Sequence, residues 1–350
     1  MKKWVCLPVS ALLFLLLSCA AFWSATAEAA GVVNLFSYRQ PFLIKPILDE
    51  FTRQTGVKVN VVFADKGVIE RIKATPGAAD AILTEDFGRL HDLEAAQVLE
   101  PFRSQVLEAN LPAQYRHPDG LWYGLTVRGR IIWVSKDRVK PGEIATYEDL
   151  ADPKWKGRVC TRSGKHVYNL FLIASVIAHK GEAAAKRWIE DLKANLAQKP
   201  QGNDRSQAKA ILAGQCDVAL SNTYYVGHML TDKKNPEQKQ WAAAIRLVFP
   251  NQADRGTHVN VSGGGVLKGA KNKANAVRLI EFLSGDFAQK LYAEQNFEYP
   301  VKPGAPVSPL VKSWGDFKAD AINLAKVAER KAAASKLVDQ VNFDGAAPRN

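Results

Sequence analysis

Apolar and polar positions follow two rhythms along the first part of the chain, one typical of strands and one typical of helices. Residues 31–42 begin with a short apolar run that ends in a polar loop, and residues 43–56 carry apolar side chains at helical spacing before a glycine. A β-rich run over 57–64, a helical pattern over 67–77 and an apolar run over 78–86 follow. This βαβαβ order predicts a parallel sheet with helices on its faces.

A second series of strands and helices begins after a longer β-like segment at residues 122–137, which is a candidate crossover between two lobes. Helical patterns cover 168–181, 182–196 and 201–216, and a strand is expected at 217–221. We therefore expect a second α/β unit in the middle of the chain.

The last third of the chain is expected to cross back between the lobes. Residues 244–269 are β-like and should return to the first lobe, residues 271–296 read as a helix pair, and the tail from Ser308 to Val341 is largely helical. Two α/β lobes joined by extended hinge crossovers form a clamp. We predict a signal peptide and two discontinuous lobes: 1–29 for the signal peptide, 30–127 plus 250–300 for lobe 1, and 128–249 plus 301–350 for lobe 2.

The N-terminus has the parts of a secretory signal peptide. A basic start is followed by an apolar run over 9–21 and by the small-residue stretch ATAEAA, which predicts cleavage near Ala27–Ala30. The apolar run is shorter than the roughly 20 residues of a membrane span. We expect a periplasmic protein, with lipoprotein anchoring at Cys19 as the alternative.

Composition and charge fit an exported globular protein. Of the 350 residues, 47% are hydrophobic and 23% are charged, and the formal net charge is +12. Acidic residues are interleaved with the basic ones along helical faces, which indicates solvated surfaces and not a nucleic-acid site. Cys160 and Cys216 remain after the signal peptide and form a disulfide candidate in an oxidising compartment; two buried thiols are the alternative.

Tyrosines gather on the loops that follow predicted strands, where ligands bind in open α/β sheets. Tyr224 and Tyr225 come directly after the strand at 217–221, Tyr168 opens a helix, and Tyr38 follows the first strand. Two adjacent tyrosines on a strand would point to opposite faces, whereas at a helix start they can converge. Phenolate oxygens suit a hard trivalent cation such as Fe³⁺. Aromatic packing is the alternative interpretation of all four.

Five segments resemble the periplasmic ferric-ion-binding proteins, the solute receptors of ABC iron importers: NTYYVG, CTRSGKHVYN, GNDRSQAKAILAGQCD, YEDLADPKWKGR and RGTHVNVSG. The similarity covers essentially the whole mature chain. It implies the two-lobe periplasmic-binding-protein fold of type II, each lobe a mostly parallel sheet flanked by helices. It also implies that Tyr168, Tyr224 and Tyr225 bind Fe³⁺ between the lobes. The expected protein is a monomer without catalytic activity that delivers its iron to an ABC permease in the inner membrane.

The fourth iron ligand departs from the pattern of this family. Many members carry a histidine or a His-Tyr pair on the loop after the first strand, where this chain has Gln40 and Pro41. Tyr38 is the candidate that we expect to supply a fourth phenolate, and Glu85 or Asp86 is the weaker alternative.

Family members also bind a synergistic anion such as carbonate, held by an arginine. Arg39, Arg128 and Arg130 are the candidates here, and ion pairing between the lobes is the other interpretation of each.

Two other classes of function are alternatives to an iron receptor. A receptor for an organic or anionic solute such as a polyamine, thiamine or a phosphonate would use the tyrosines for stacking or hydrogen bonding. A secreted enzyme is disfavoured because the sequence shows no nucleophile–base pair and no nucleophile-elbow motif. The six histidines show no closely paired zinc-ligand spacing.

Overall fold

The computed structural model describes residues 1, 31–64 and 66–345. The predicted signal peptide, its cleavage region near Ala27–Ala30 and the alternative lipoprotein residue Cys19 therefore lie outside the described residues, apart from Met1. No helix in the described part of the chain is long and apolar enough to cross a membrane.

Strands and helices alternate through most of the described chain. The strands are β1 (Val32–Ser37), β2 (Lys58–Phe63), β3 (Ala81–Thr84), β4 (Leu99–Glu100), β5 (Tyr123–Ser135), β6 (Val159–Cys160), β7 (Val218–Asn222), β8 (Ile245–Val248), β9 (Val259–Leu267) and β10 (Tyr299–Pro300). The α-helices are α1 (Pro41–Thr55), α2 (Val68–Ala74), α3 (Phe87–Ala95), α4 (Gln105–Asn110), α5 (Val167–Lys180), α6 (Glu182–Ala194), α7 (Asp204–Leu212), α8 (Tyr225–Thr231), α9 (Gln238–Ala243), α10 (Lys273–Ser284), α11 (Asp286–Leu291), α12 (Pro309–Lys312), α13 (Leu324–Ala328) and α14 (Lys331–Gln340). Short 3₁₀ turns occur at Ala113–Tyr115, Glu148–Ala151 and Pro153–Trp155, and a π-helical turn at Tyr292–Asn296.

The strands join in the order β2-β1-β3-β9-β5-β7-β6, with β4 added beside β9 and with β8 and β10 beside β5. The pairs β1–β2, β1–β3 and β6–β7 are parallel, and the remaining pairs are antiparallel. The sheets are therefore mixed, although the repeated βα pattern predicts mostly parallel strands. The reason is that β5 and β9 enter the sheet as crossovers instead of as members of βαβ units.

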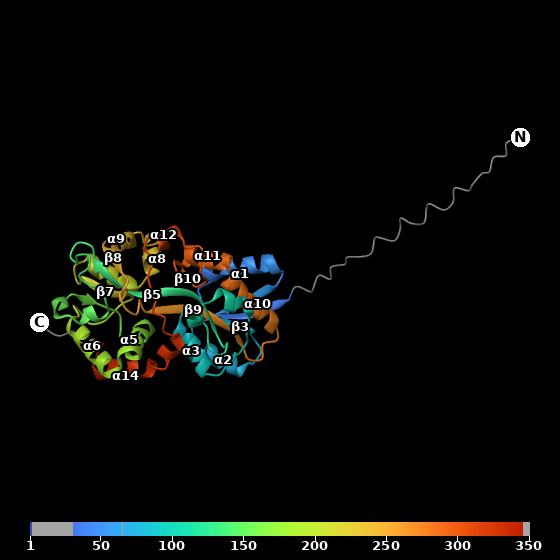
Figure 1. Ribbon diagram of the computed structural model, residues 1–350, viewed down its shortest axis with the longest axis horizontal. Helices are drawn as coiled ribbons and strands as arrows, with labels where there is room; N and C mark the ends of the chain where they lie inside the picture. The colour runs from blue at the N-terminus through green and yellow to red at the C-terminus, as the bar shows by residue number, and fades with distance from the viewer. Residues whose placement is uncertain (2–30, 65, 346–350) are drawn as a thin grey trace.

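The long strand β5 belongs to both halves of the molecule. Its first half, up to Gly129, pairs with β9, and its second half, from Arg130, pairs with β7 and β8. Figure 1 shows β5 and β9 in the middle of the molecule, with β3 and α10 at one end and β7 and α6 at the other. Residues 122–137 thus contain the long crossover strand that their pattern predicts, and the strand changes partners between Gly129 and Arg130.

The two halves also touch outside the strands. Phe87 at the start of α3 meets Phe171 of α5 edge to face, with ring centroids 5.7 Å apart. On the other side, the ring of Phe297 lies 5.2 Å from that of His228 in α8. A Cβ atom on Gly227 would lie 2.2 Å from the Phe297 ring, so α8 needs a glycine at this contact.

A large apolar core runs through both halves, and a second, smaller cluster lies behind α8. Val226 and Met229 of α8 are buried in this second cluster together with Ile131 and Trp133 of β5. Burial of these side chains fixes the helix against the sheet, and with it the direction in which the start of α8 faces.

Candidate metal centre

Tyr168 is placed by the start of helix α5. The chain leaves β6, turns, and begins α5 at Val167, with His166 as the N-cap residue. The His166 imidazole accepts a hydrogen bond from the Tyr168 backbone N–H at 3.2 Å, and the two rings pack edge to face with centroids 4.5 Å apart. Burial, followed by the charge of Arg162, lowers the pKa of His166 to about 4, which keeps the imidazole neutral and able to accept this bond. The histidine thus orients the first turn of the helix.

Tyr224 and Tyr225 are placed by the end of β7. Thr223 follows the strand, Tyr224 occupies the N-cap position, and α8 begins at Tyr225. The rings of the two tyrosines lie on the same side, with centroids 4.3 Å apart and planes inclined by 34°. A continued strand would have separated them. The turn into a helix is therefore what brings the two phenols together.

The starts of α5 and α8 meet at the phenol oxygens. The Oη atoms of Tyr168 and Tyr224 are 3.1 Å apart, and they belong to residues 56 positions apart in the chain. Two oxygen ligands at about 2.1 Å from a small cation, at right angles to each other, would be separated by about 3.0 Å. The spacing of these two oxygens therefore fits a shared ion.

The phenols are protonated at neutral pH when no cation is bound. Burial raises the pKa of both Tyr168 and Tyr224, and the charges of the neighbouring tyrosines raise it further, while the Arg128 guanidinium opposes the increase. A cation at this point must therefore displace protons in order to bind. In the described part of the chain, no group of three or more His, Cys, Asp or Glu residues offers a competing metal site.

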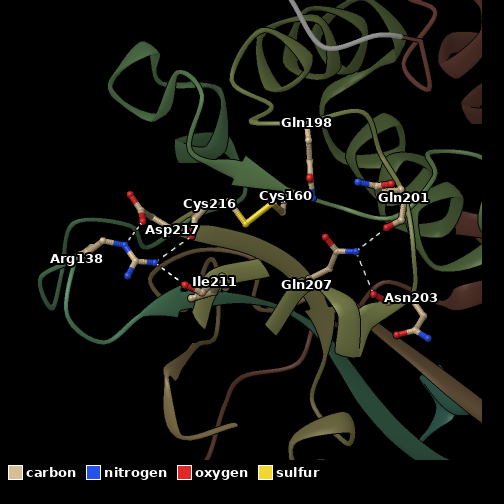
Figure 2. Close-up of a disulfide and its surroundings, with 9 residues drawn as sticks. All are labelled: Arg138, Cys160, Gln198, Gln201, Asn203, Gln207, Ile211, Cys216 and Asp217. Atoms are coloured by element: carbon tan, nitrogen blue, oxygen red, sulfur yellow. Dashed lines mark hydrogen bonds and ion pairs between the residues drawn. A yellow bond between two sulfur atoms is a disulfide. The ribbon is translucent and has the colours of Figure 1, made fainter. Parts of the chain in front are cut away.

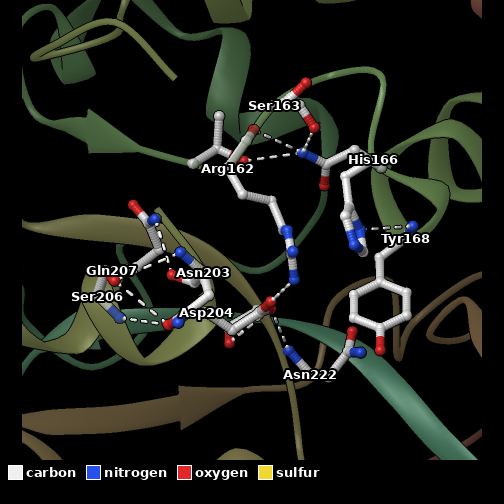
Figure 3. A network of polar contacts seen from close by, with 12 residues as sticks. Arg162, Ser163, His166, Tyr168, Asn203, Asp204, Ser206, Gln207 and Asn222 are labelled. Carbon is white, nitrogen blue, oxygen red and sulfur yellow. Dashed lines mark hydrogen bonds and ion pairs between the residues drawn. The ribbon is translucent and has the colours of Figure 1, made fainter. Parts of the chain in front are cut away.

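A buried charge network lies beneath Tyr168 (Figure 3). Asp204 is fully buried and forms ion pairs with both Arg130 and Arg162. Arg130 also donates to Asn169 Oδ1 at 2.7 Å and to Asn222 Oδ1 at 3.1 Å. Burial alone would raise the pKa of Asp204, but the two guanidiniums hold it below its ordinary value.

This network has a net positive charge and faces the tyrosines. Two guanidiniums and one carboxylate sum to one positive charge, and the guanidinium carbons of Arg162 and Arg130 lie 5.2 and 5.8 Å from the centroid of the Tyr168 ring. Asp204 nevertheless raises the pKa of Tyr168 and Tyr224, and the guanidinium that lowers both values is that of Arg128.

The candidates from the first lobe lie in other surroundings. The ring of Tyr38, just after β1, packs under the Arg89 guanidinium at 4.0 Å, and burial raises its pKa. Glu85 accepts a hydrogen bond from Arg89 at 2.6 Å through Oε1. Within residues 31–64 and 66–345, no hydrogen bond or ring contact joins Tyr38 or Glu85 to the three tyrosines of the second lobe.

Arg39, Gln40 and Arg128 lie near Tyr38 and Glu85, and they differ in how many of their hydrogen-bond donors already have a partner. Arg39 is buried in an ion pair with Glu298 at 2.9 Å, and Gln40 is exposed at the start of α1 without a side-chain capping bond. Arg128 donates to Ser262 Oγ at 2.8 Å and to the Glu85 carbonyl, while its buried Nε has no partner in the described chain. Of the three side chains, Arg128 is the one whose charge reaches Tyr168 and Tyr224.

Residues 79–319 match the family described as bacterial extracellular solute-binding protein. That span is more than half of the chain. The chain belongs to this family. Among proteins of known function, it is 43% identical over 315 residues to iron uptake protein A1 of Synechocystis, with 89% of this chain and 87% of the relative covered.

This solute-binding protein is also similar to solved structures of iron-binding proteins. It resembles the ferric iron-binding protein A of Mannheimia haemolytica in an open conformation, with a TM-score of 0.86, 51% identity and coverage of 90% of this chain and 100% of the other. It also resembles a Trichodesmium protein in complex with iron and citrate, with a TM-score of 0.86, 42% identity and coverage of 89% and 100%. The two-lobe periplasmic-binding-protein fold of type II, expected from the sequence, is confirmed.

A disulfide ties together the two strands that precede the tyrosines (Figure 2). Cys160 ends β6 and Cys216 lies two residues before β7, with Cα atoms 5.9 Å apart and 56 positions between them in sequence. By chain entropy, closing a loop of this length contributes about 4 kcal/mol. The loop before α5 separates Cys160 from Tyr168, and strand β7 separates Cys216 from Tyr224.

Sequence reasoning missed the residues that support the tyrosines. In the segment GNDRSQ, Asn203 and Asp204 both stand where the sequence pattern favours a helix N-cap. In the structure Asn203 caps α7 through a reciprocal bond pattern with Ser206, and Asp204 points to the two arginines instead. Glu298, which pairs with Arg39, gave no signal either. An acidic residue in the first turn of a helix usually indicates a cap. No local sequence pattern shows that such a residue, here Asp204, forms a buried ion pair instead.

Proposed function

We propose that this solute-binding protein captures ferric iron through Tyr168, Tyr224 and Tyr225 in the periplasm and delivers it to an ABC permease of the inner membrane. The observation that carries the proposal is the convergence of the two helix starts, which places two phenol oxygens 3.1 Å apart with a third tyrosine ring beside them. The relatives named for iron uptake and ferric iron binding support it.

The charges of the site suit a trivalent ion. Three phenolates carry three negative charges, which neutralise Fe³⁺ without a carboxylate. The charge of Arg128 lowers the pKa of Tyr168 and Tyr224, so the protonated phenols lose their protons more readily than burial alone would allow. A hard cation of high charge benefits more than a divalent one from such oxygen ligands.

The two lobes contribute unequally to the proposed site. We assign residues 30–127 and 250–300 to lobe 1 and residues 128–249 and 301–350 to lobe 2, so all three tyrosines belong to lobe 2. Tyr38, or less favourably Glu85, supplies a fourth ligand from lobe 1 when the lobes close on the ion. Ligands from both lobes stabilise the closed state only when iron is bound. Gln40, exposed at the start of α1, is a possible additional contact.

A synergistic anion such as carbonate fits beside Arg128. Arg39 and Arg130 each have a full carboxylate partner, in Glu298 and Asp204, whereas the nearest carboxylate to Arg128 is 3.7 Å away. Its position between Ser262 and the tyrosines makes it the best of the three candidates. The Trichodesmium relative binds iron together with citrate, which supports an anion at such a site.

The test is a visible absorption titration of the mature protein with ferric citrate. Phenolate bound to Fe³⁺ absorbs visible light, so a band that saturates at one iron per chain is expected. Tyr224→Phe and Tyr225→Phe should each lose or shift the band. Tyr299→Phe is the matched control, because the buried hydroxyl of Tyr299 has no partner in the described chain. Absence of a band at saturating iron would favour an organic or anionic solute instead.

A further inference from the structure

A cavity lies away from the tyrosines, between residues 103–123 and the start of helix α13. It has a volume of about 260 Å³ and is lined mainly by Arg103, Arg116, His117, Tyr123 and Asn323. Tyr123 begins β5, and Arg128 lies five residues further along the same strand. At the rise of an extended strand, this separates the two backbones by about 17 Å. The cavity is therefore distinct from the candidate metal centre.

The walls of this cavity are held in place by hydrogen bonds. The backbones of Arg116 and Tyr123 form an antiparallel bridge, and the His117 N–H donates to the Trp122 carbonyl at 3.0 Å. The Tyr123 hydroxyl donates to the Phe102 carbonyl at 2.6 Å. A site whose backbone is fixed in this way loses little conformational entropy when it binds a ligand.

Two guanidiniums face the cavity with unused donors. Arg103 donates to the Pro118 carbonyl at 2.6 Å, but Arg103 and Arg116 lie 3.8 and 4.0 Å from the nearest carboxylate, Glu108, which is beyond hydrogen-bonding distance. The Nε atom of Arg116 is buried and has no hydrogen-bond partner among the described residues. A buried guanidinium N–H without an acceptor is unfavourable, so an acceptor from a ligand would stabilise it.

The histidine in the wall is already engaged. His117 Nδ1 accepts from the Asp119 N–H at 3.0 Å, so its proton lies on Nε2, which is 3.0 Å from Glu94 Oε1. It therefore serves as a fixed wall, and the two arginines supply the available charge.

We propose that this cavity binds a small oxyanion, a phosphate or carboxylate group, between Arg103 and Arg116. A guanidinium presents its N–H groups as a planar fork that matches these anions. The volume is slightly below the range of about 300–1,000 Å³ for sites of drug-sized ligands, which suits a small anion better than a large solute.

The anion would join two distant parts of the chain. Arg103 and Arg116 belong to the first lobe, whereas Asn323 caps α13 near the C-terminus, and α13 packs against both α3 and α5. Helix α5 begins next to Tyr168. Occupation of the cavity would therefore stabilise the attachment of the C-terminal segment to both lobes.

The experiment is isothermal titration of the iron-free full chain with inorganic phosphate and, separately, with tricarballylate, at constant ionic strength. Arg103→Gln and Arg116→Gln are each expected to weaken binding by about tenfold or more. Arg187→Gln removes an exposed arginine on α6 and should bind like the wild type. The anion that binds the wild type identifies the chemical class.

Thermal unfolding gives an independent measurement. The bound anion should raise the midpoint of the wild type and of Arg187→Gln, and this increase should be lost in Arg116→Gln. Arg116→Lys, which keeps the charge but not the fork, should recover only part of it. The proposal fails if neither anion binds the wild type, or if all the arginine variants titrate alike. It also fails if the cavity variants lose the iron–phenolate band, because the site would then not be separate from the tyrosines.

Discussion

The tyrosines of the second lobe and the candidate ligands of the first lobe differ in how far the structure assembles them. Tyr168, Tyr224 and Tyr225 stand at two neighbouring helix starts and are already in contact. Tyr38 and Glu85 are instead engaged with Arg89, in a separate cluster. One lobe can therefore assemble most of an ion site by itself, because helix starts at the ends of adjacent strands meet without any movement of the lobes.

Acidification should have the largest effect on the second-lobe site. The pKa values of Tyr168 and Tyr224 are raised, so each phenol is protonated below its pKa and must release its proton to bind iron. Iron affinity should fall by up to about a thousandfold for each unit by which the pH decreases, one factor of ten for each of three displaced protons. Competition against a chelator, corrected for the protonation of the chelator, measures the slope. A slope near zero would break the assignment to phenolates.

Loss of one phenol from the second lobe should have the next largest effect on iron affinity. Tyr168→Phe should lower iron affinity by more than about 100-fold, because groups that merely support metal ligands already account for 10- to 100-fold. Equilibrium dialysis with radioactive iron measures it, with Tyr299→Phe as the control that removes a buried hydroxyl elsewhere. Equal affinities in the two variants would exclude Tyr168 as a ligand.

Removal of the Asp204 carboxylate from the network beneath the tyrosines should lower the free energy of unfolding. Asp204→Asn leaves two buried guanidiniums without their carboxylate, so the free energy of unfolding should fall by about 3–5 kcal/mol in urea at neutral pH. Asp49→Asn removes the carboxylate of an exposed ion pair with Lys45 and should leave the unfolding midpoint unchanged.

The same network predicts a pH dependence. The pKa of Asp204 is lowered in the folded state, so its contribution is fully present above the ordinary aspartate value of about 3.9 and is lost as the pH falls through the lower folded value. The stability difference between the wild type and Asp204→Asn should therefore shrink below about pH 4. A difference that stays constant down to acid pH would show that the carboxylate charge is not what the variant removes.

Substitution of Tyr38, the candidate ligand from the first lobe, should have the smallest effect on iron affinity. Tyr38→Phe should lower iron affinity by about tenfold or less, because the phenol reaches the ion only after the lobes close and must first leave Arg89. Parallel titrations of Tyr38→Phe and Tyr168→Phe make the comparison directly. A larger loss of iron affinity in Tyr38→Phe than in Tyr168→Phe would show that the first lobe contributes more to iron binding than the second.

Local pattern accounts for much of the fold and for the core of the candidate site. The apolar spacing of residues 168–181 predicts α5, and the two tyrosines directly after the strand at 217–221 favour a helix start at that point. The continuous β pattern at 122–137 predicts the crossover strand. Each of these features depends on neighbours within a few residues, which the order of the amino acids contains directly.

Only the tertiary structure decided which charged groups meet. Arg39 and Glu298 are 259 positions apart in the sequence, and Arg130 and Asp204 are 74 apart, yet both pairs are buried and bonded. The sequence determined where the tyrosines and the helix starts lie. The packing of two lobes around β5 and β9 determined their partners, because the energy of a buried charge depends on groups that the chain brings together from afar.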